Sequence, residues 1–418
     1  MSRAVKLKGT LWAALAAVAV VGGTVQPAAA ADLGGNCCAD LEERIAELEV
    51  TTARKGNRKV SLTVSGWVNE AIFFWDDGVE KNVYQGTNEL EQSRFRLNGE
   101  AKITDGWTAG FILEIGANGG GSKTFSQATD GLTGQVTTRK SAWFVKSKDF
   151  GKVTLGRFDT ATYHSVDNLD TTLTRNVSDF ETVGVALGAF NTRVGGVAGQ
   201  KWTDFMGGFN NATPGQSGLR QTARYDTPEI AGFTASASWG SDDQWETSLK
   251  YKGDIGDFAV TAAAGYGEST DSVINTGQCS VGNGDCQWWG AGALVSHKPT
   301  GLYIYGAYAE NHIDLKQLQN GDDSSSALYI QAGIEQKFNT LGKTNFFGEY
   351  RKDDVGLSRA AIASDLDFWA FGVAQNVESA DMILYAQYRR ASGEFTKGAA
   401  TSKLDDFDMV ITGAKINF

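Results

Sequence analysis

Long apolar runs are nearly absent from this 418-residue sequence. The exception is near the N-terminus, where basic residues at 3–8 precede an apolar run at 11–21 and three alanines occupy 28–30. This order is typical of a secretory signal peptide, so residues 1–30 are predicted to be removed on export. No later stretch reaches the ~18 consecutive apolar residues that a transmembrane helix needs, so a membrane role requires a β-barrel.

Basic residues are too few to suggest a nucleic-acid partner. The chain has 38 Lys and Arg against 49 Asp and Glu, and loss of three cations with the signal peptide lowers its formal charge from -11 to -14. No segment offers the basic face that a phosphate backbone requires, so we expect no nucleic acid to bind.

Residues that serve catalysis or metal binding are also scarce. The three histidines, His164, His297 and His312, are widely separated, and nothing near them has metal-ligand spacing. The segment that most resembles a phosphate-binding loop, 116–124, has Ser122 between its last glycine and its lysine, which is the wrong spacing. We therefore expect no enzyme activity, no metal and no cofactor.

Only four cysteines are present. Cys279 and Cys286 close a short loop in a protein predicted to be exported to an oxidising compartment, so they are predicted to form a disulfide. A zinc site would need two more ligands. The adjacent Cys37 and Cys38 leave two alternatives open, a bridge between subunits or free thiols.

A short helix is predicted soon after the signal peptide. Asp40 has the character of an N-cap, with Glu43 three residues later. Leu41, Ile45 and Leu48 follow at helical spacing, but this seam is too short to be stable alone. The segment is either an amphipathic cap or a small coiled coil between subunits that already associate elsewhere.

From Val60 onward most segments alternate with a period of two. Between 94 and 103, even positions are polar and odd positions are apolar or small, which a soluble sandwich and a membrane barrel share. The number of strands is even, and short turns are interspersed with long loops, which favours an outer-membrane barrel over a secreted adhesin or lectin. Sixteen strands are predicted, at 60–75, 91–103, 107–117, 138–147, 151–158, 219–227, 232–240, 245–252, 257–266, 287–296, 301–309, 327–337, 344–351, 366–375, 381–390 and 407–418.

Two motifs resemble those of general bacterial porins. Gly-Lys-Val-Thr-Leu-Gly-Arg at 151–157 precedes a very long loop, and Thr-Ala-Arg-Tyr-Asp-Thr-Pro-Glu-Ile-Ala-Gly-Phe at 222–233 follows it. The resemblance extends over the chain beyond Val60, and the terminal Phe418 agrees with it. Residues 31–59 are similar to the periplasmic extension that porins of alphaproteobacteria often carry.

The resemblance implies an all-β fold, a 16-stranded antiparallel transmembrane β-barrel formed by residues 60–418. It also implies a homotrimer in contact with outer-membrane lipid and lipopolysaccharide, with one pore in each subunit. A third loop, residues 159–217, would fold inward and narrow the pore. The function implied is that of a general diffusion porin for small hydrophilic solutes, and the alternative is a substrate-specific outer-membrane channel.

In related porins, acidic residues of the third loop face basic residues on the opposite wall. The acidic candidates here are Asp159, Asp167, Asp170, Asp179 and Glu181. The basic candidates are Arg94, Arg96, Arg139 or Lys140, Arg220 and Arg224. Parity with neighbouring apolar residues predicts that Arg94, Arg96, Arg220 and Arg224 face the lumen. The fourth strand, with Arg139 and Lys140, is ambiguous by one residue, which would reverse its faces. Opposed charges would set up a transverse field, whereas the alternative for each residue is ordinary solvation in the lumen.

Two further hypotheses follow. The surplus of acidic residues in the whole chain and in the third loop predicts a weakly cation-selective pore. The predicted mature N-terminus, Ala31-Asp32, matches that of alphaproteobacterial barrel proteins that attach to peptidoglycan as a class. That attachment would tether the barrel to the cell wall.

Overall fold

The structure is a computed structural model that describes residues 59–131, 134–167, 169–178, 187, 189–206, 218–240, 244–270, 286–313, 324–356 and 363–418. The N-terminal unit, Met1–Arg58, lies outside these residues. The predictions that therefore lie outside the described residues concern the signal peptide, the short helix, Ala31-Asp32, Cys37, Cys38, Asp179, Glu181 and Cys279.

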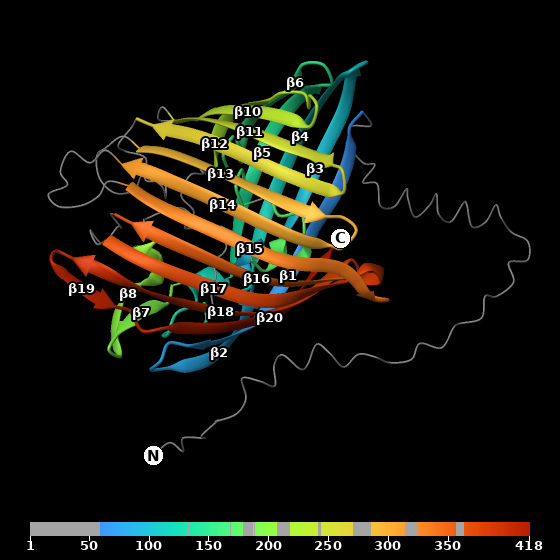
Figure 1. Cartoon of the computed structure of the whole chain (residues 1–418). Helices are drawn as coiled ribbons and strands as arrows, with labels where there is room; N and C mark the ends of the chain where they lie inside the picture. The colour runs from blue at the N-terminus through green and yellow to red at the C-terminus, as the bar shows by residue number, and fades with distance from the viewer. Residues whose placement is uncertain are drawn as a thin grey trace, which may run out of the picture. The chain divides into compact units, whose positions relative to one another are not determined.

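Within the described residues, sixteen antiparallel strands close into a barrel, which confirms the predicted fold (Figure 1). Each strand pairs with the next along the chain, and the last pairs with the first from Trp67 opposite Asn417 to Asp76 opposite Asp408. The strands are β1 (Ser61–Asp76), β3 (Arg94–Thr104), β4 (Trp107–Asn118), β5 (Gln135–Ser147), β6 (Gly151–Asp159), β9 (Leu219–Asp226), β10 (Phe233–Gly240), β11 (Gln244–Ile255), β12 (Phe258–Ser269), β13 (Cys286–His297), β14 (Leu302–Ile313), β15 (Ser324–Asn339), β16 (Gly342–Val355), β17 (Ala363–Val377), β18 (Met382–Lys397) and β20 (Phe407–Asn417).

Several strands extend farther than predicted at their long-loop ends. β18 continues to Lys397, where the prediction ended at residue 390, and there it pairs with the added strand β19 (Ala400–Lys403). A second added strand, β2 (Lys81–Thr87), pairs with the far half of β1. These extensions are polar, so they lack the apolar alternation that the prediction used.

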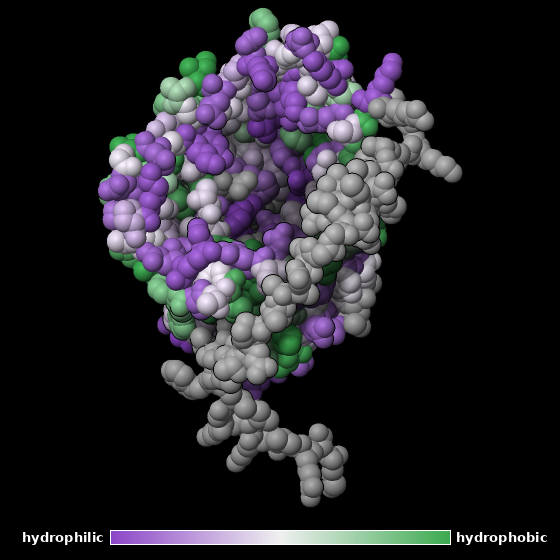
Figure 2. All heavy atoms as spheres, turned by 90° about the vertical axis from the view of Figure 1, so that its right-hand side faces the viewer, coloured by the Kyte–Doolittle hydropathy of each residue, from purple (hydrophilic) through white to green (hydrophobic). Residues whose placement is uncertain are grey.

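Side chains alternate between the two faces of the barrel. On β1, Asn69, Ala71 and Phe73 are buried on the inside, whereas Val68 and Ile72 are exposed on the outside. Figure 2, which looks at the short-turn end, shows hydrophilic residues around a central hollow and hydrophobic residues around the outside. An apolar outer surface of this kind is solvated by lipid, and the polar lumen is solvated by water. Among the described residues, no helix is long and apolar enough to span a membrane.

An aromatic core fills one side of the barrel at the long-loop end. The ring of Phe190, from the long loop, lies 5.1 Å from that of Trp75 and 4.9 Å from that of Phe407. Trp202 and Phe205, in the short helix α3 (Trp202–Phe205), are also buried in this core. Because buried aromatic packing fixes position strongly, the distal part of the long loop is held against this side of the barrel.

A hairpin of the long loop, β7 (Asn191–Val194) and β8 (Val197–Lys201), is also held by charge. The guanidinium of Arg193 donates to Asp77 at 2.8 Å and to Glu80 at 3.0 Å. Burial raises the pKa of Asp77, but hydrogen bonds from Glu80, Gln127, Arg193 and Val79 outweigh burial and lower it overall. The hairpin is therefore anchored to the loop that follows β1.

Candidate functional site: a charged constriction

The long loop returns into the barrel as soon as β6 ends. The backbone of Ala161 donates to Ser238 Oγ at 2.8 Å, and that of Thr162 donates to the carboxylate of Glu246 at 2.8 Å. Farther along, the hydroxyl of Tyr305 donates to the carbonyl of Val166. These partners are on β10, β11 and β14, so residues 160–166 follow the inner wall of the barrel.

The tip of the loop then docks on β15, β16 and β18. The short helix η3 (Leu173–Asn176) begins with the Leu173 backbone donating to Glu335 at 2.8 Å, and Gln331 donates to Thr174 at 2.7 Å. Arg389 donates to Ser178 Oγ at 2.7 Å and to Glu349 at 2.9 Å. Because most of these side chains are buried and hydrogen-bonded, the tip is fixed to the wall.

Two acidic residues of the loop are engaged in these internal contacts. Asp170 is 4% exposed and accepts hydrogen bonds from Thr172 and Thr174. Burial raises its pKa, and hydrogen bonds to the two threonines only partly offset that effect. Asp167 is buried, with its Oδ2 2.6 Å from His164 Nδ1 and 3.9 Å from Arg175 Nη2. The structure thus places neither carboxylate openly in the lumen.

The opposite wall carries a cluster of arginines around one carboxylate, Glu114. The side chain of Glu114 is fully buried, and its two oxygens accept from Arg96 and from Arg139 Nε at 2.9 Å. Arg94 Nη1 lies 3.6 Å from the same carboxylate. The arginines were predicted from the sequence, but Glu114 was not. The signal was present, because Glu114 is the one charged residue in the otherwise apolar or small run 109–117.

A β-bulge explains the ambiguity of the fourth predicted strand. In the pairing of β4 with β5, Glu114 is opposite Lys140 and Ile115 is opposite Thr138, so Arg139 is the extra residue. A bulge lets two successive side chains turn to the same face. Arg139 therefore bonds Glu114, while Lys140 bonds Asp159, the last residue of β6, at 2.5 Å.

Glu91 links the long loop to the wall formed by Arg94, Arg96 and Arg139, which is called the arginine wall below. Glu91, in the short helix η1 (Glu89–Glu91), lies 3.4 Å from Arg94 on the wall and 3.5 Å from Arg175 on the loop. Burial acts to raise the pKa of Glu91, but the positive charges of Arg94, Arg175, Lys415 and His164 outweigh it and lower the pKa to about 2. Glu91 is therefore a carboxylate at neutral pH and joins the loop to the wall.

Tyr163 and His164 complete the loop side of the constriction. Their rings lie 3.7 Å apart, and Tyr163 is close enough to Arg94 and Arg139 to interact electrostatically with both. His164 has a φ of 61°, which is unusual for a residue with a side chain. This left-handed backbone is a feature that the sequence does not reveal.

The two predicted basic residues of β9 have different surroundings. Arg224 donates to the carbonyl of Thr160 at 2.8 Å and pairs with Asp226 at 2.7 Å, so it anchors the start of the loop. Arg220 is opposite Phe158 in the register of β6 and β9, on the same face as Arg224. The structure does not bring either into the cluster around Glu114.

The sequence matches the profile of the Gram-negative porin family over residues 13–397. The chain belongs to this family. A closed 16-stranded barrel and membership of this family together place the porin in the outer membrane, as a multi-pass β-barrel that forms a channel. Curated proteins of known sequence gave no significant match.

Solved structures of other porins share the fold. An anion-selective porin from Comamonas acidovorans superposes with a TM-score of 0.57 at 17% identity, covering 86% of this chain and 100% of that one. OmpT of Vibrio cholerae in its trimer form gives 0.53 at 15% identity, covering 86% and 99%. OmpF of Salmonella typhi, in complex with daunomycin, gives 0.54 at 13% identity, covering 87% and 99%. At these identities the likeness concerns the fold alone.

Cys286 begins β13 of the porin and is buried in a disulfide. Its predicted partner, Cys279, lies outside the described residues, so the pairing stays a prediction. Within the described ranges, no group of three His, Cys, Asp or Glu residues has a metal-binding arrangement.

Proposed function

We propose that this porin is a general diffusion channel that passes small hydrophilic solutes through a water-filled, charged constriction. The observation that carries the proposal is the contact between residues 160–178 of the long loop and the arginine wall. A lumen narrowed by charged and hydrogen-bonded side chains admits solutes that stay hydrated and disfavours apolar ones. We propose that the protein has no enzymatic activity, because passive diffusion through a channel requires no catalysis.

The sign of the ion selectivity follows from the constriction and not from the whole chain. Around it the described residues supply four carboxylates, Glu91, Glu114, Asp159 and Asp167. They also supply six cations, Arg94, Arg96, Arg139, Lys140, Arg175 and Lys415. We therefore propose a weak preference for anions, which replaces the expectation of cation selectivity drawn from the acidic surplus of the whole chain and of the third loop.

Planar-bilayer recording of the purified protein, together with liposome swelling in sugars of increasing size, tests the channel proposal. We expect a conductance proportional to salt concentration and a swelling rate that falls smoothly with sugar size. A protein that inserts as a folded barrel but neither conducts nor admits the smallest sugar contradicts the proposal.

A substrate-specific anion channel is the second candidate, because basic residues also line the lumen beyond the constriction. Lys152 lies beside Phe144 and Phe158 on the channel face, and Lys250 of β11 interacts electrostatically with Asp167 of the loop. A conductance that saturates with one anion and not with chloride would favour this candidate.

We also propose that the subunits associate as homotrimers in contact with lipid and lipopolysaccharide. The support is the family and the neighbour solved in trimer form. Chemical cross-linking in native outer membranes, with a three-subunit product expected, tests the assembly. Attachment of Ala31-Asp32 to peptidoglycan remains a separate proposal, tested by mass analysis of the native N-terminus after wall digestion.

A further inference from the structure

A row of three lysines and one threonine, called the lysine row below, crosses four neighbouring strands near the short-turn end of the barrel. Lys102 of β3 is opposite Thr108 of β4, Thr108 is opposite Lys146 of β5, and Lys146 is opposite Lys152 of β6. By the alternation of each strand, all four side chains lie on the channel face, the same face as Glu114. The row is therefore part of the channel lining, on the wall that carries the arginine cluster.

The pairing of Lys146 with Lys152 has a cost. Like charges directly opposite each other in an antiparallel pair destabilise the sheet. On its other side Lys152 is opposite Asp226, but that carboxylate pairs with Arg224 at 2.7 Å. Lys152 itself forms no ion pair within the described part of the chain. An anion bound to the row would relieve this repulsion.

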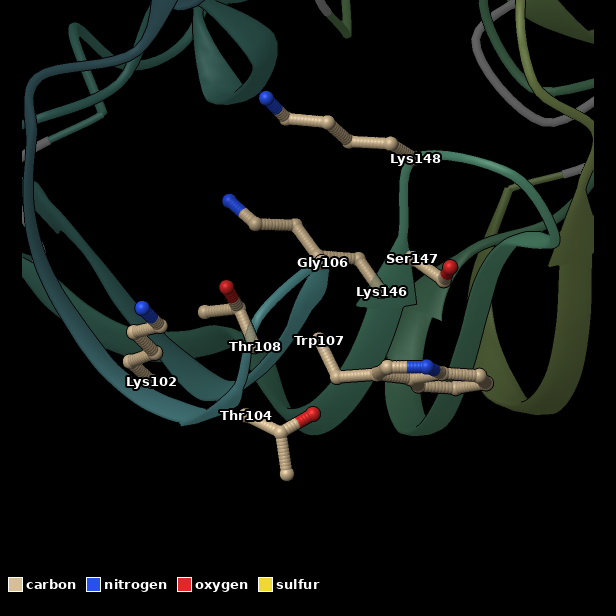
Figure 3. Close-up of a pocket in the computed structure, with 8 residues that line it drawn as sticks. All are labelled: Lys102, Thr104, Gly106, Trp107, Thr108, Lys146, Ser147 and Lys148. Carbon is tan, nitrogen blue, oxygen red and sulfur yellow. The ribbon is translucent and has the colours of Figure 1, made fainter.

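A pocket of about 300 Å³ adjoins the row, between the turn after β3 and the end of β5 (Figure 3). That volume is at the lower end of the ~300–1,000 Å³ typical of small-molecule sites. In Figure 3 the side chains of Lys102, Lys146 and Lys148 extend to one side, and the Trp107 indole extends to the other. The lining also includes Thr108, which is opposite Lys102 and Lys146 in the sheet register, and Thr104 and Ser147, which are opposite Trp107.

The lysines of the pocket are bound only weakly by the protein. Lys102 pairs with Asp105, but the two side chains are 69% and 97% exposed. Lys146 pairs with Glu100 at 2.8 Å, with exposures of 42% and 45%. Exposed pairs of this kind contribute little to stability. Among the described residues Lys148 has no ion pair. A multivalent anion that binds these lysines therefore displaces only weak contacts with protein carboxylates.

We propose that this pocket and the lysine row form a binding site for a phosphate group at the short-turn mouth of the channel. Ammonium groups supply point charges for phosphate oxygens, and the hydroxyl of Thr108, on the same face as Lys102 and Lys146, supplies a neutral hydrogen-bond donor. The phosphate belongs either to a soluble ester in the channel or to the headgroup of an anionic lipid at the rim. The proposal rests on the proposed function only in that the site opens onto the channel.

The test compares two triple variants of the folded, detergent-solubilised porin. Lys102→Gln, Lys146→Gln and Lys148→Gln together remove the pocket cations. The matched control also removes three lysines at short turns elsewhere in the barrel, Lys298 in the turn after β13, Lys337 of β15 and Lys343 of β16. Binding of inorganic phosphate and of pyrophosphate is measured by calorimetry and by phosphorus NMR.

We expect the pocket variant to bind pyrophosphate at least about tenfold more weakly, since it loses several charge-assisted hydrogen bonds, and the control to stay within about twofold. Equal weakening in both variants would mean that general rim charge attracts the anion, and it would overturn the site. A second arm measures phosphatidylglycerol retained by each variant from mixed-lipid nanodiscs. Loss of retention in the pocket variant alone assigns the phosphate to lipid.

A wild-type protein that binds neither soluble phosphate nor phosphatidylglycerol at the pocket overturns the inference. Bilayer conductance of the same preparation keeps the two proposals separate. A conducting protein without phosphate binding leaves the porin function standing. A protein that binds phosphate but does not conduct contradicts the channel proposal and leaves the site standing.

Discussion

Arg96 and Glu114 lie directly opposite each other on β3 and β4, and the guanidinium donates from both Nε and Nη2 to one carboxylate oxygen. Arg139 of β5 donates to the other oxygen. Among the described residues, Arg96 Nη1 and Arg139 Nη2 have no protein acceptor. A single buried carboxylate therefore holds two guanidinium groups in position without using all of their donors.

The first prediction concerns that carboxylate. Glu114→Gln should destabilise the barrel by roughly 1–3 kcal/mol, because it leaves half-buried arginines without their counterion. The loss is smaller than for a dry ion pair, since the Arg96 side chain is 29% exposed. Urea titration followed by the gel mobility of folded and unfolded forms measures the change. As a control, Glu268→Gln on the outer face should leave the midpoint unchanged, and an equal loss there would argue against a central role for Glu114.

The second prediction tests the bulge at Arg139. In a background in which Cys37 and Cys38 are replaced by serine, single cysteines at Arg139 and Lys140 should both react with a water-soluble thiol reagent. A cysteine at Ser141 should not react, because that position faces lipid. Reaction at only one of the first two positions, with reaction at Ser141, would show regular alternation and no bulge.

The barrel was predictable because the same sequence pattern is repeated in strand after strand. Alternation between an apolar outer face and a polar lumen, with prolines confined to connections, specifies each strand on local grounds. β2 and β19 were missed because they are short and mostly polar, so their alternation is weak. The closure of β20 on β1 then follows, since a barrel in lipid has no free edge.

The constriction was predictable only in part. Parity predicted the arginines of β3 on the channel face, and in the structure both lie beside Glu114, whereas the bulge in β5 has no sequence signal as strong as a glycine or proline. The positions of Asp167 and Asp170 depend on where the long loop docks, which is set by contacts with Gln331, Glu335 and Glu349, far away in sequence. Local patterns cannot supply such contacts.

The third prediction concerns the hairpin of the long loop. Arg193→Ala should loosen residues 187–206, because Asp77 loses a partner that lies 2.8 Å away and is itself 2% exposed. Removing one partner of a buried pair typically costs about 3–5 kcal/mol. We expect a noisier and larger single-channel conductance. Arg157→Ala, which removes an exposed arginine of β6, should conduct like the wild type, and a quiet Arg193→Ala channel would mean that the aromatic core alone holds the hairpin.

The fourth prediction is a pH dependence at Glu91, whose pKa is lowered from 4.5 to about 2. A carboxyl with a lowered pKa in the folded state contributes stability that is fully present above 4.5 and is lost as the pH falls through 2. Channel conductance and noise should therefore stay constant from pH 7 to 4.5 and change between 4.5 and 2. Glu91→Gln should show the altered behaviour already at pH 7, whereas Glu89→Gln, in the same short helix, should not.

The last prediction concerns ion selectivity, measured as the reversal potential under a salt gradient. Because the Debye length is about 8 Å at physiological salt, only charges at the constriction act strongly on passing ions. Arg96→Gln with Arg139→Gln should shift the reversal potential toward cations. Arg390→Gln should not, although it also removes a positive charge, because that side chain pairs with Asp408 at 2.7 Å on the outer face.

Asp170→Asn separates this explanation from one in which the acidic loop residues dominate. The Asp170 carboxyl is buried, and its raised pKa favours the neutral form that the amide mimics, so the reversal potential should stay within the scatter of the wild type. A shift toward anions as large as the opposite shift in the double arginine variant would mean that Asp170 is charged and acts on the pore. In that case the loop, and not the arginine wall, would set the selectivity.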